Sequence, residues 1–87
     1  MITGLNRVFS HNGKEYHIQT EDLGSQAACF EVRVYDQGAV LWSKKVPYAE
    51  IVQKGLPKTE QEEALRSLMD KTLQTVQAAI AKGKLAG

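Results

Sequence analysis

The sequence has few of the residues from which metal sites and disulfides are built. Its 87 residues include one cysteine, Cys29, and two histidines, His11 and His17. A single cysteine excludes an internal disulfide and suits a reducing compartment. A structural zinc site usually has four closely spaced ligands, which these residues do not supply. We therefore expect no metal ion and no cofactor.

Long apolar runs and an excess of one charge are also missing. No segment approaches the roughly 18 consecutive apolar residues of a membrane-spanning helix. The first residues, MITGLNRVFS, lack the basic region and apolar stretch of a signal peptide. Lys and Arg number 11 and Asp and Glu 10, a net charge of +1, so no global field attracts nucleic acid or anionic lipid. We expect a cytoplasmic protein that does not bind membranes.

The usual combinations of catalytic residues are missing too. A nucleophile needs an adjacent base, whereas Cys29 falls within a predicted strand, where a cysteine is more often a half-buried spacer. Glu15, His17, Glu21 and Glu31 could be drawn as an acid–base site, but alternating charges are typical of the solvated face of an antiparallel sheet. No glycine-rich phosphate loop or dinucleotide fingerprint is present. The sequence therefore predicts that the protein is not an enzyme.

What the sequence does contain is a strongly amphipathic helix, predicted over residues 59–82. Thr59 and Glu62 predict a capping box at its start, and Gly83 predicts a left-handed residue at its end. Its apolar residues follow the i, i+3, i+4, i+7 pattern of a helix with one buried face: Leu65, Leu68, Met69, Leu73, Val76, Ala79 and Ile80. Such a helix needs an apolar surface to lie on.

The preceding residues predict that surface, beginning with a hairpin of strands at 5–10 and 14–22. Asn12-Gly13 favours a two-residue type I′ turn, in which both residues have positive φ. This turn pairs Phe9 with Tyr16. One face then carries Leu5, Phe9, Tyr16 and Ile18, and the other carries Val8, Glu15, His17, Gln19 and Glu21.

A second hairpin is predicted, with strands at 28–35 and 39–46. We predict a three-residue loop at 36–38, because a two-residue turn would place Trp42 opposite Arg33, on the wrong face. The pairs expected from this loop are Val34 with Val40 and Val32 with Trp42.

The predicted fold is a single α+β domain over residues 1–87. A four-stranded antiparallel meander is covered on one face by the long C-terminal helix, and a short helix at 47–54 precedes it. The expected core consists of Leu5, Phe9, Tyr16, Ile18, Phe30, Val32, Val34, Val40, Trp42, Val46, Leu65, Leu68, Met69, Leu73, Val76 and Ile80.

The sheet face away from the long helix, here called the outer face, is the candidate functional surface. Its mixture of Tyr, Arg, Leu, Val and His is less polar than a solvated face needs, although scattered apolar residues are normal on any surface. The predicted function is a non-catalytic protein–protein interaction module or adaptor. We also expect some self-association. The candidate binding residues are Val8, His17, Gln19, Glu31, Arg33, Tyr35, Leu41 and Lys45.

The alternative function is single-stranded nucleic-acid binding. Basic residues and aromatic rings could contact phosphates and bases: Arg7, Lys14, Arg33, Lys44 and Lys45, with Tyr16, Tyr35 and Trp42. Trp42 is expected in the core, however, and glutamates interrupt the basic set. No known RNA- or DNA-binding signature is present.

One stretch resembles a known pattern. Residues 12–24, NGKEYHIQTEDLG, together with Ser43-Lys44-Lys45 and Tyr48-Ala49-Glu50, resemble the first part of small, poorly characterised bacterial proteins in which a strand is followed by Glu-Asp-x-Gly and two further strands. This resemblance covers roughly the first 50 residues and implies no catalytic residues. Some such proteins resemble adaptors of bacterial polarity and motility systems that work beside a small GTPase and a response regulator, which implies an adaptor role.

Overall fold

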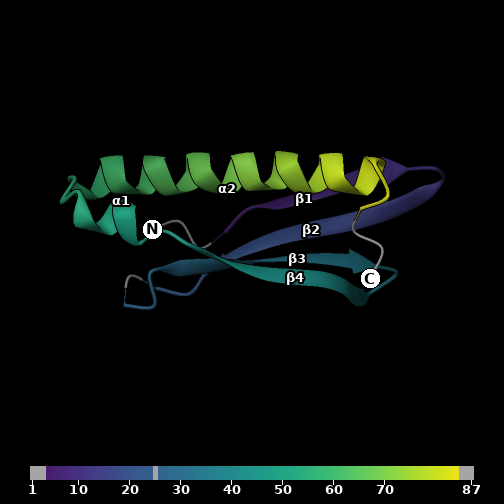
Figure 1. Cartoon of the computed structure of the whole chain (residues 1–87), viewed down its shortest axis with the longest axis horizontal. Coiled ribbons are helices and arrows are strands. Elements are labelled where there is room, and N and C mark those ends of the chain that lie inside the picture. Colours follow the sequence, from purple (N-terminus) through teal and green to yellow (C-terminus); the bar gives the residue numbers. More distant parts are fainter. Residues whose placement is uncertain (1–3, 25, 85–87) are drawn as a thin grey trace.

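The computed structural model describes residues 4–24 and 26–84. Its elements are β1 (Asn6–His11), β2 (Lys14–Asp22), β3 (Cys29–Asp36), β4 (Ala39–Pro47), α1 (Ala49–Gln53) and α2 (Lys58–Ala81). The strands form one antiparallel sheet in the order β1-β2-β3-β4, and α2 runs along one face of it (Figure 1). The predicted α+β fold is therefore confirmed. Neither helix in the described residues has the length and apolar character needed to cross a membrane.

The first hairpin forms as predicted. Asn12 and Gly13 have φ values of 52° and 78°, which a type I′ turn requires. Phe9 lies opposite Tyr16, and the main-chain N–H of Thr20 donates to the carbonyl of Leu5 at 2.9 Å. The alternation of side chains therefore places Ile18 and Thr20, both buried, on the face toward α2.

The second hairpin differs from the prediction. Gln37 and Gly38 have φ values of 54° and 83° and form a two-residue turn, so the predicted three-residue loop is wrong. A β-bulge in β4 restores the orientation of Trp42, because the ladder passes from Tyr35–Val40 to Val34–Trp42 and leaves Leu41 as the extra residue. Val32 consequently pairs with Lys44 rather than with Trp42.

The bulge exchanges the environments of two neighbouring residues. Val40 was expected in the core, but it lies opposite Tyr35 and its residue is 55% exposed. Leu41 was expected on the outer face, but it packs against the core cluster and is only partly exposed. One inserted residue reverses the side-chain alternation that precedes it, so both expectations were wrong for the same reason.

Helix α2 begins and ends one residue earlier than predicted, at Lys58 and Ala81, and the predicted left-handed glycine follows its end. Its N-cap is Pro57, which has no hydroxyl group, and Thr59 lies inside the first turn, so the predicted capping box is wrong. At the other end Gly83 has a φ of 71°. The N–H of Lys84 donates to the carbonyl of Ala79 at 2.8 Å, and that of Gly83 to Ile80 at 3.0 Å. These two bonds form a Schellman motif.

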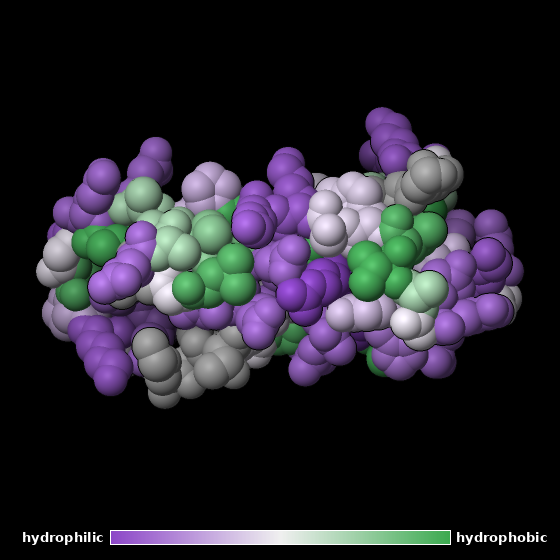
Figure 2. Space-filling view, turned by 90° about the horizontal axis from the view of Figure 1, so that it is seen from below, coloured by the Kyte–Doolittle hydropathy of each residue, from purple (hydrophilic) through white to green (hydrophobic). Residues whose placement is uncertain are grey.

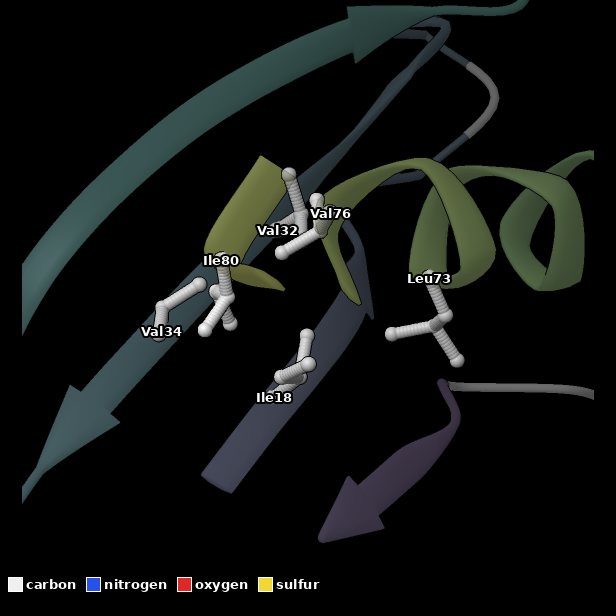
Figure 3. Packing of buried hydrophobic residues seen from close by; sticks show 6 residues of the cluster. All are labelled: Ile18, Val32, Val34, Leu73, Val76 and Ile80. Carbon is white, nitrogen blue, oxygen red and sulfur yellow. The ribbon is translucent and has the colours of Figure 1, made fainter. Parts of the chain in front are cut away.

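The core lies between α2 and the strands β2 and β3. Figure 3 shows Leu73, Val76 and Ile80 of α2 pointing toward Ile18, Val32 and Val34 of the sheet. A second cluster, beside α1, contains Phe30, Tyr48, Leu65 and Met69. The apolar stripe of α2 and the alternate strand residues that face it therefore form most of the buried interior.

Tyr48 connects the start of α1 to the end of β2. Its residue is only 5% exposed, and its hydroxyl donates a hydrogen bond to the Asp22 carboxylate, which also accepts the N–H of Gly24 at 3.0 Å. Burial, and then the bond to Asp22, raise the pKa of the Tyr48 hydroxyl. The hydroxyl therefore stays protonated and donates well into the alkaline range.

We expect Tyr48→Phe to lower the free energy of unfolding by about 1–2 kcal/mol near neutral pH, because one hydrogen bond to a carboxylate is lost. Tyrosine in the unfolded chain ionises near its ordinary pKa of 10.0, whereas the folded pKa is higher. This contribution is thus complete below pH 10 and declines as the pH rises from 10 toward the higher pKa of the folded state. Urea unfolding from pH 7 to 11 tests both points. A variant that loses stability above pH 10 as steeply as the wild type would contradict this role.

Candidate functional site

The outer face is organised in rows that cross all or most of the sheet. The ladder places Asn6, Gln19, Arg33 and Ser43 in one row, and Glu21, Glu31 and Lys45 in the next. Since side chains alternate along each strand, every member of these rows points away from α2. Most of the predicted binding residues therefore share one surface.

A third row, at the end of the sheet nearer the two hairpin turns, is apolar and aromatic. It consists of Val8, His17, Tyr35 and Val40, which are neighbours across β1, β2, β3 and β4. Val8 is 54% and Val40 55% exposed. Figure 2 shows the side of the molecule away from α2, where separate apolar groups are divided by strongly hydrophilic residues. We call the row of Val8, His17, Tyr35 and Val40 the apolar row.

Arg33 lies beside this row and is held by two carboxylates. Its guanidinium forms ion pairs with Glu31, on the same strand, and with Glu21, on β2, at 3.3 Å. Hydrogen bonding to Tyr35 and to Glu31 raises the pKa of Arg33 further above its ordinary value. The arginine is therefore a fixed positive group with defined neighbours rather than a freely rotating side chain.

All but one of the predicted binding residues lie on the outer face. Leu41 is the exception, because the bulge turns it toward the core. Val40 takes its place on the outer face and was missed. The signal that could have found it is Gln37-Gly38, since glycine at the second position of a two-residue turn accepts positive φ.

The residues considered for metal binding and for nucleic-acid binding are not brought together. Two pairs of the group considered for acid–base chemistry are: His17 Nε2 lies 3.3 Å from a Glu15 carboxylate oxygen, and Glu21 lies opposite Glu31. Among residues 4–24 and 26–84, no three His, Cys, Asp or Glu side chains could jointly hold a metal ion. Cys29 is partly exposed. The basic residues of the nucleic-acid hypothesis divide between the faces: Lys45 lies opposite Glu31 on the outer face, and Lys44 opposite the buried Val32.

Arg7 reaches α2 instead of extending into solvent. Its guanidinium forms an ion pair with Asp70 at 2.7 Å and donates to Gln77 at 3.4 Å. An arginine at the edge of a core often keeps its stem on apolar surface while its charged head reaches water. The Arg7 guanidinium instead binds two side chains of α2, and these contacts connect β1 to one side of the helix.

A groove that the sequence did not reveal lies on the other side of α2. It has a volume of about 410 Å³ and runs between α2 and β4. Its walls are largely apolar, with Trp42 and Val46 on β4 facing Leu68 and Ala79 on α2. We call it the α2–β4 groove.

Comparisons of the chain with protein-family models, with curated proteins and with solved structures found no match. The resemblance carried by residues 12–24 therefore stays a prediction. The function is accordingly inferred from the physical properties of the outer face and of the α2–β4 groove.

Proposed function

We propose that this protein is a non-catalytic protein-binding module, an adaptor that works in the cytoplasm and binds a protein partner through its outer face. The observation that carries the proposal is the apolar row beside Arg33. Val8 and Val40 offer apolar area, while Tyr35 and Arg33 are of the residue types that contribute most to protein interfaces.

The fixed position of Arg33 supports the same function. Two carboxylates already restrict its side chain, so binding costs less conformational entropy than it does for a free arginine. The backbone of Arg33 belongs to β3, a central strand, and is held by hydrogen bonds to the strands on both sides. A preorganised centre of this kind favours a specific partner.

Binding of single-stranded nucleic acid is the less favoured function. Glu21 and Glu31 lie against Arg33 and would repel a phosphate, and the basic residues do not form one continuous track. Affinity for nucleic acid falls steeply with salt, whereas a mixed apolar and polar protein interface depends on salt weakly. Salt dependence therefore distinguishes the two functions. Self-association through the outer face stays a prediction.

A photo-cross-linking residue at Gln19 tests the proposal directly. Gln19 is exposed and adjoins Arg33 across the ladder. Irradiation in a lysate of the source cells is expected to give a protein adduct that resists nuclease. The control places the same residue at Ser67, which is exposed on α2. Adducts that disappear with nuclease, or that form equally at Ser67, would contradict protein binding through the outer face.

A further inference from the structure

The sheet is wider than the single helix that covers it. Four strands spaced roughly 4.8 Å apart span about 14 Å between the outer strands, whereas a helix with its side chains is about 10–12 Å across. Helix α2 does not lie centrally but toward β1, where Arg7 binds Asp70 and Gln77. Figure 1 shows α2 beside β1. The inner side of β4 is consequently left partly uncovered.

The α2–β4 groove occupies this uncovered strip. On α2 its wall consists of residues at helical spacings of three and four, namely Leu68, Thr72, Thr75, Val76 and Ala79. They extend over about 16 Å of helix, or three turns. Trp42 forms the opposite wall and is partly exposed although it is large and aromatic.

Two lysines flank this apolar strip from opposite sides. Lys44 lies on β4 and Lys71 on α2, and both line the groove. Neither forms an ion pair within the described residues. The groove is thus apolar along its floor and positively charged along both rims.

We propose that the α2–β4 groove binds an amphipathic helix of a partner protein, about three turns long, whose apolar stripe is flanked by Asp or Glu. A helix lying beside α2 at an interaxial distance of about 8–10 Å covers the exposed part of β4. Its carboxylates pair with Lys44 and Lys71, and its apolar stripe covers Trp42. This site is separate from the outer face, so an adaptor with both sites holds two partners at once.

An added strand fits this site less well than a helix. The free edge of β4 carries Lys44, Lys45, Pro47 and the bulge at Leu41, all of which hinder pairing with another strand. A second copy of the chain also fits poorly. A symmetric contact of two grooves brings Lys44 and Lys71 of both copies together, and like charges repel.

The test uses a displayed library of three-turn helical peptides with a fixed apolar stripe, randomised flanking positions and no tryptophan. Selection against the full chain is expected to enrich Asp and Glu at the flanks. The chain has one tryptophan, Trp42, so its fluorescence reports binding in the groove alone. A shift of its emission to shorter wavelength with a selected peptide is the expected result.

A pair of adjacent variants locates the binding site. Ala79→Glu places a carboxylate in the groove, and Ala78→Glu places one on the exposed side of α2. We expect the first to weaken peptide binding at least tenfold and the second by less than twofold. The double variant Lys44→Glu/Lys71→Glu is expected to reverse the preference, so that a peptide with lysine flanks binds about tenfold better than its glutamate counterpart.

Several results overturn the proposal. Enrichment of basic or neutral flanks, absence of any enriched peptide, or equal effects of Ala79→Glu and Ala78→Glu each contradict it. A Trp42 emission shift that grows with protein concentration alone assigns the groove to a second copy. A single-stranded oligonucleotide that binds there more tightly than the selected peptides assigns it to nucleic acid.

Discussion

Replacing Leu73 with alanine is expected to lower the free energy of unfolding by about 2–5 kcal/mol. Leu73 is fully buried, lies at the centre of the α2 stripe and belongs to the buried cluster that also contains Ile18 and Val32 of the sheet. Truncation removes buried methyl groups and leaves a cavity that the strands on one side and the helix on the other cannot close. Since small domains are stabilised by about 5–15 kcal/mol, much of the stability is lost.

Urea unfolding of Leu73→Ala beside Ser67→Ala measures this effect. Ser67 is exposed on the same helix, so its replacement is expected to change the free energy by no more than about 0.5 kcal/mol. If Leu73→Ala unfolds at the same urea concentration as the wild type, α2 does not pack on the sheet at this point.

Replacing Tyr35 with alanine is expected to weaken partner binding about 30-fold, equivalent to about 2 kcal/mol. Tyr35 lies between His17 and Val40 in the apolar row and beside Arg33, so its ring is placed at the centre of the proposed interface. Titration calorimetry with the partner captured at Gln19 measures the change.

The matched control is Tyr16→Ala, the same substitution on the inner face of β2. Tyr16 packs against the core cluster, so this variant is expected to lose stability while its folded fraction binds normally. Tyr35→Ala is expected to keep its stability and to bind the partner more weakly. Equal affinities for Tyr35→Ala and the wild type would exclude Tyr35 from the interface.

Local signals in the sequence predict the elements and the first hairpin well. Asn12-Gly13 determines a turn with two positive φ values, and the register of β1 and β2 follows from it. Gly83 similarly determines the end of α2. In each case neighbouring residues decide the backbone conformation, so no knowledge of distant contacts is required.

The second hairpin shows where local reasoning fails. The pattern of β4 requires Trp42 to face the core, and a chain can meet that requirement with a longer loop or with a bulge. The structure has the bulge, which moves Val40 to the outer face and Leu41 to the core. The two solutions give Trp42 the same orientation, so periodicity alone does not distinguish them.

The α2–β4 groove was not predictable for a different reason. Its existence depends on how far α2 lies toward β1, a placement that brings Arg7 into contact with Asp70 across 63 residues of sequence. Amphipathic periodicity identifies the stripe that is buried, but not the lateral position of the helix on the sheet. The periodicity therefore assigns Leu68 to the core, although in the structure it lines a surface groove.

The most direct test of the proposed function is methyl NMR of the valine-labelled protein titrated with the partner captured at Gln19. Val8 and Val40 lie on the outer face, whereas Val32 and Val34 are fully buried beneath α2. We predict that the methyl signals of Val8 and Val40 shift and saturate while those of Val32 and Val34 stay in place. Saturable binding that leaves Val8 and Val40 unchanged would contradict the outer face as the binding surface.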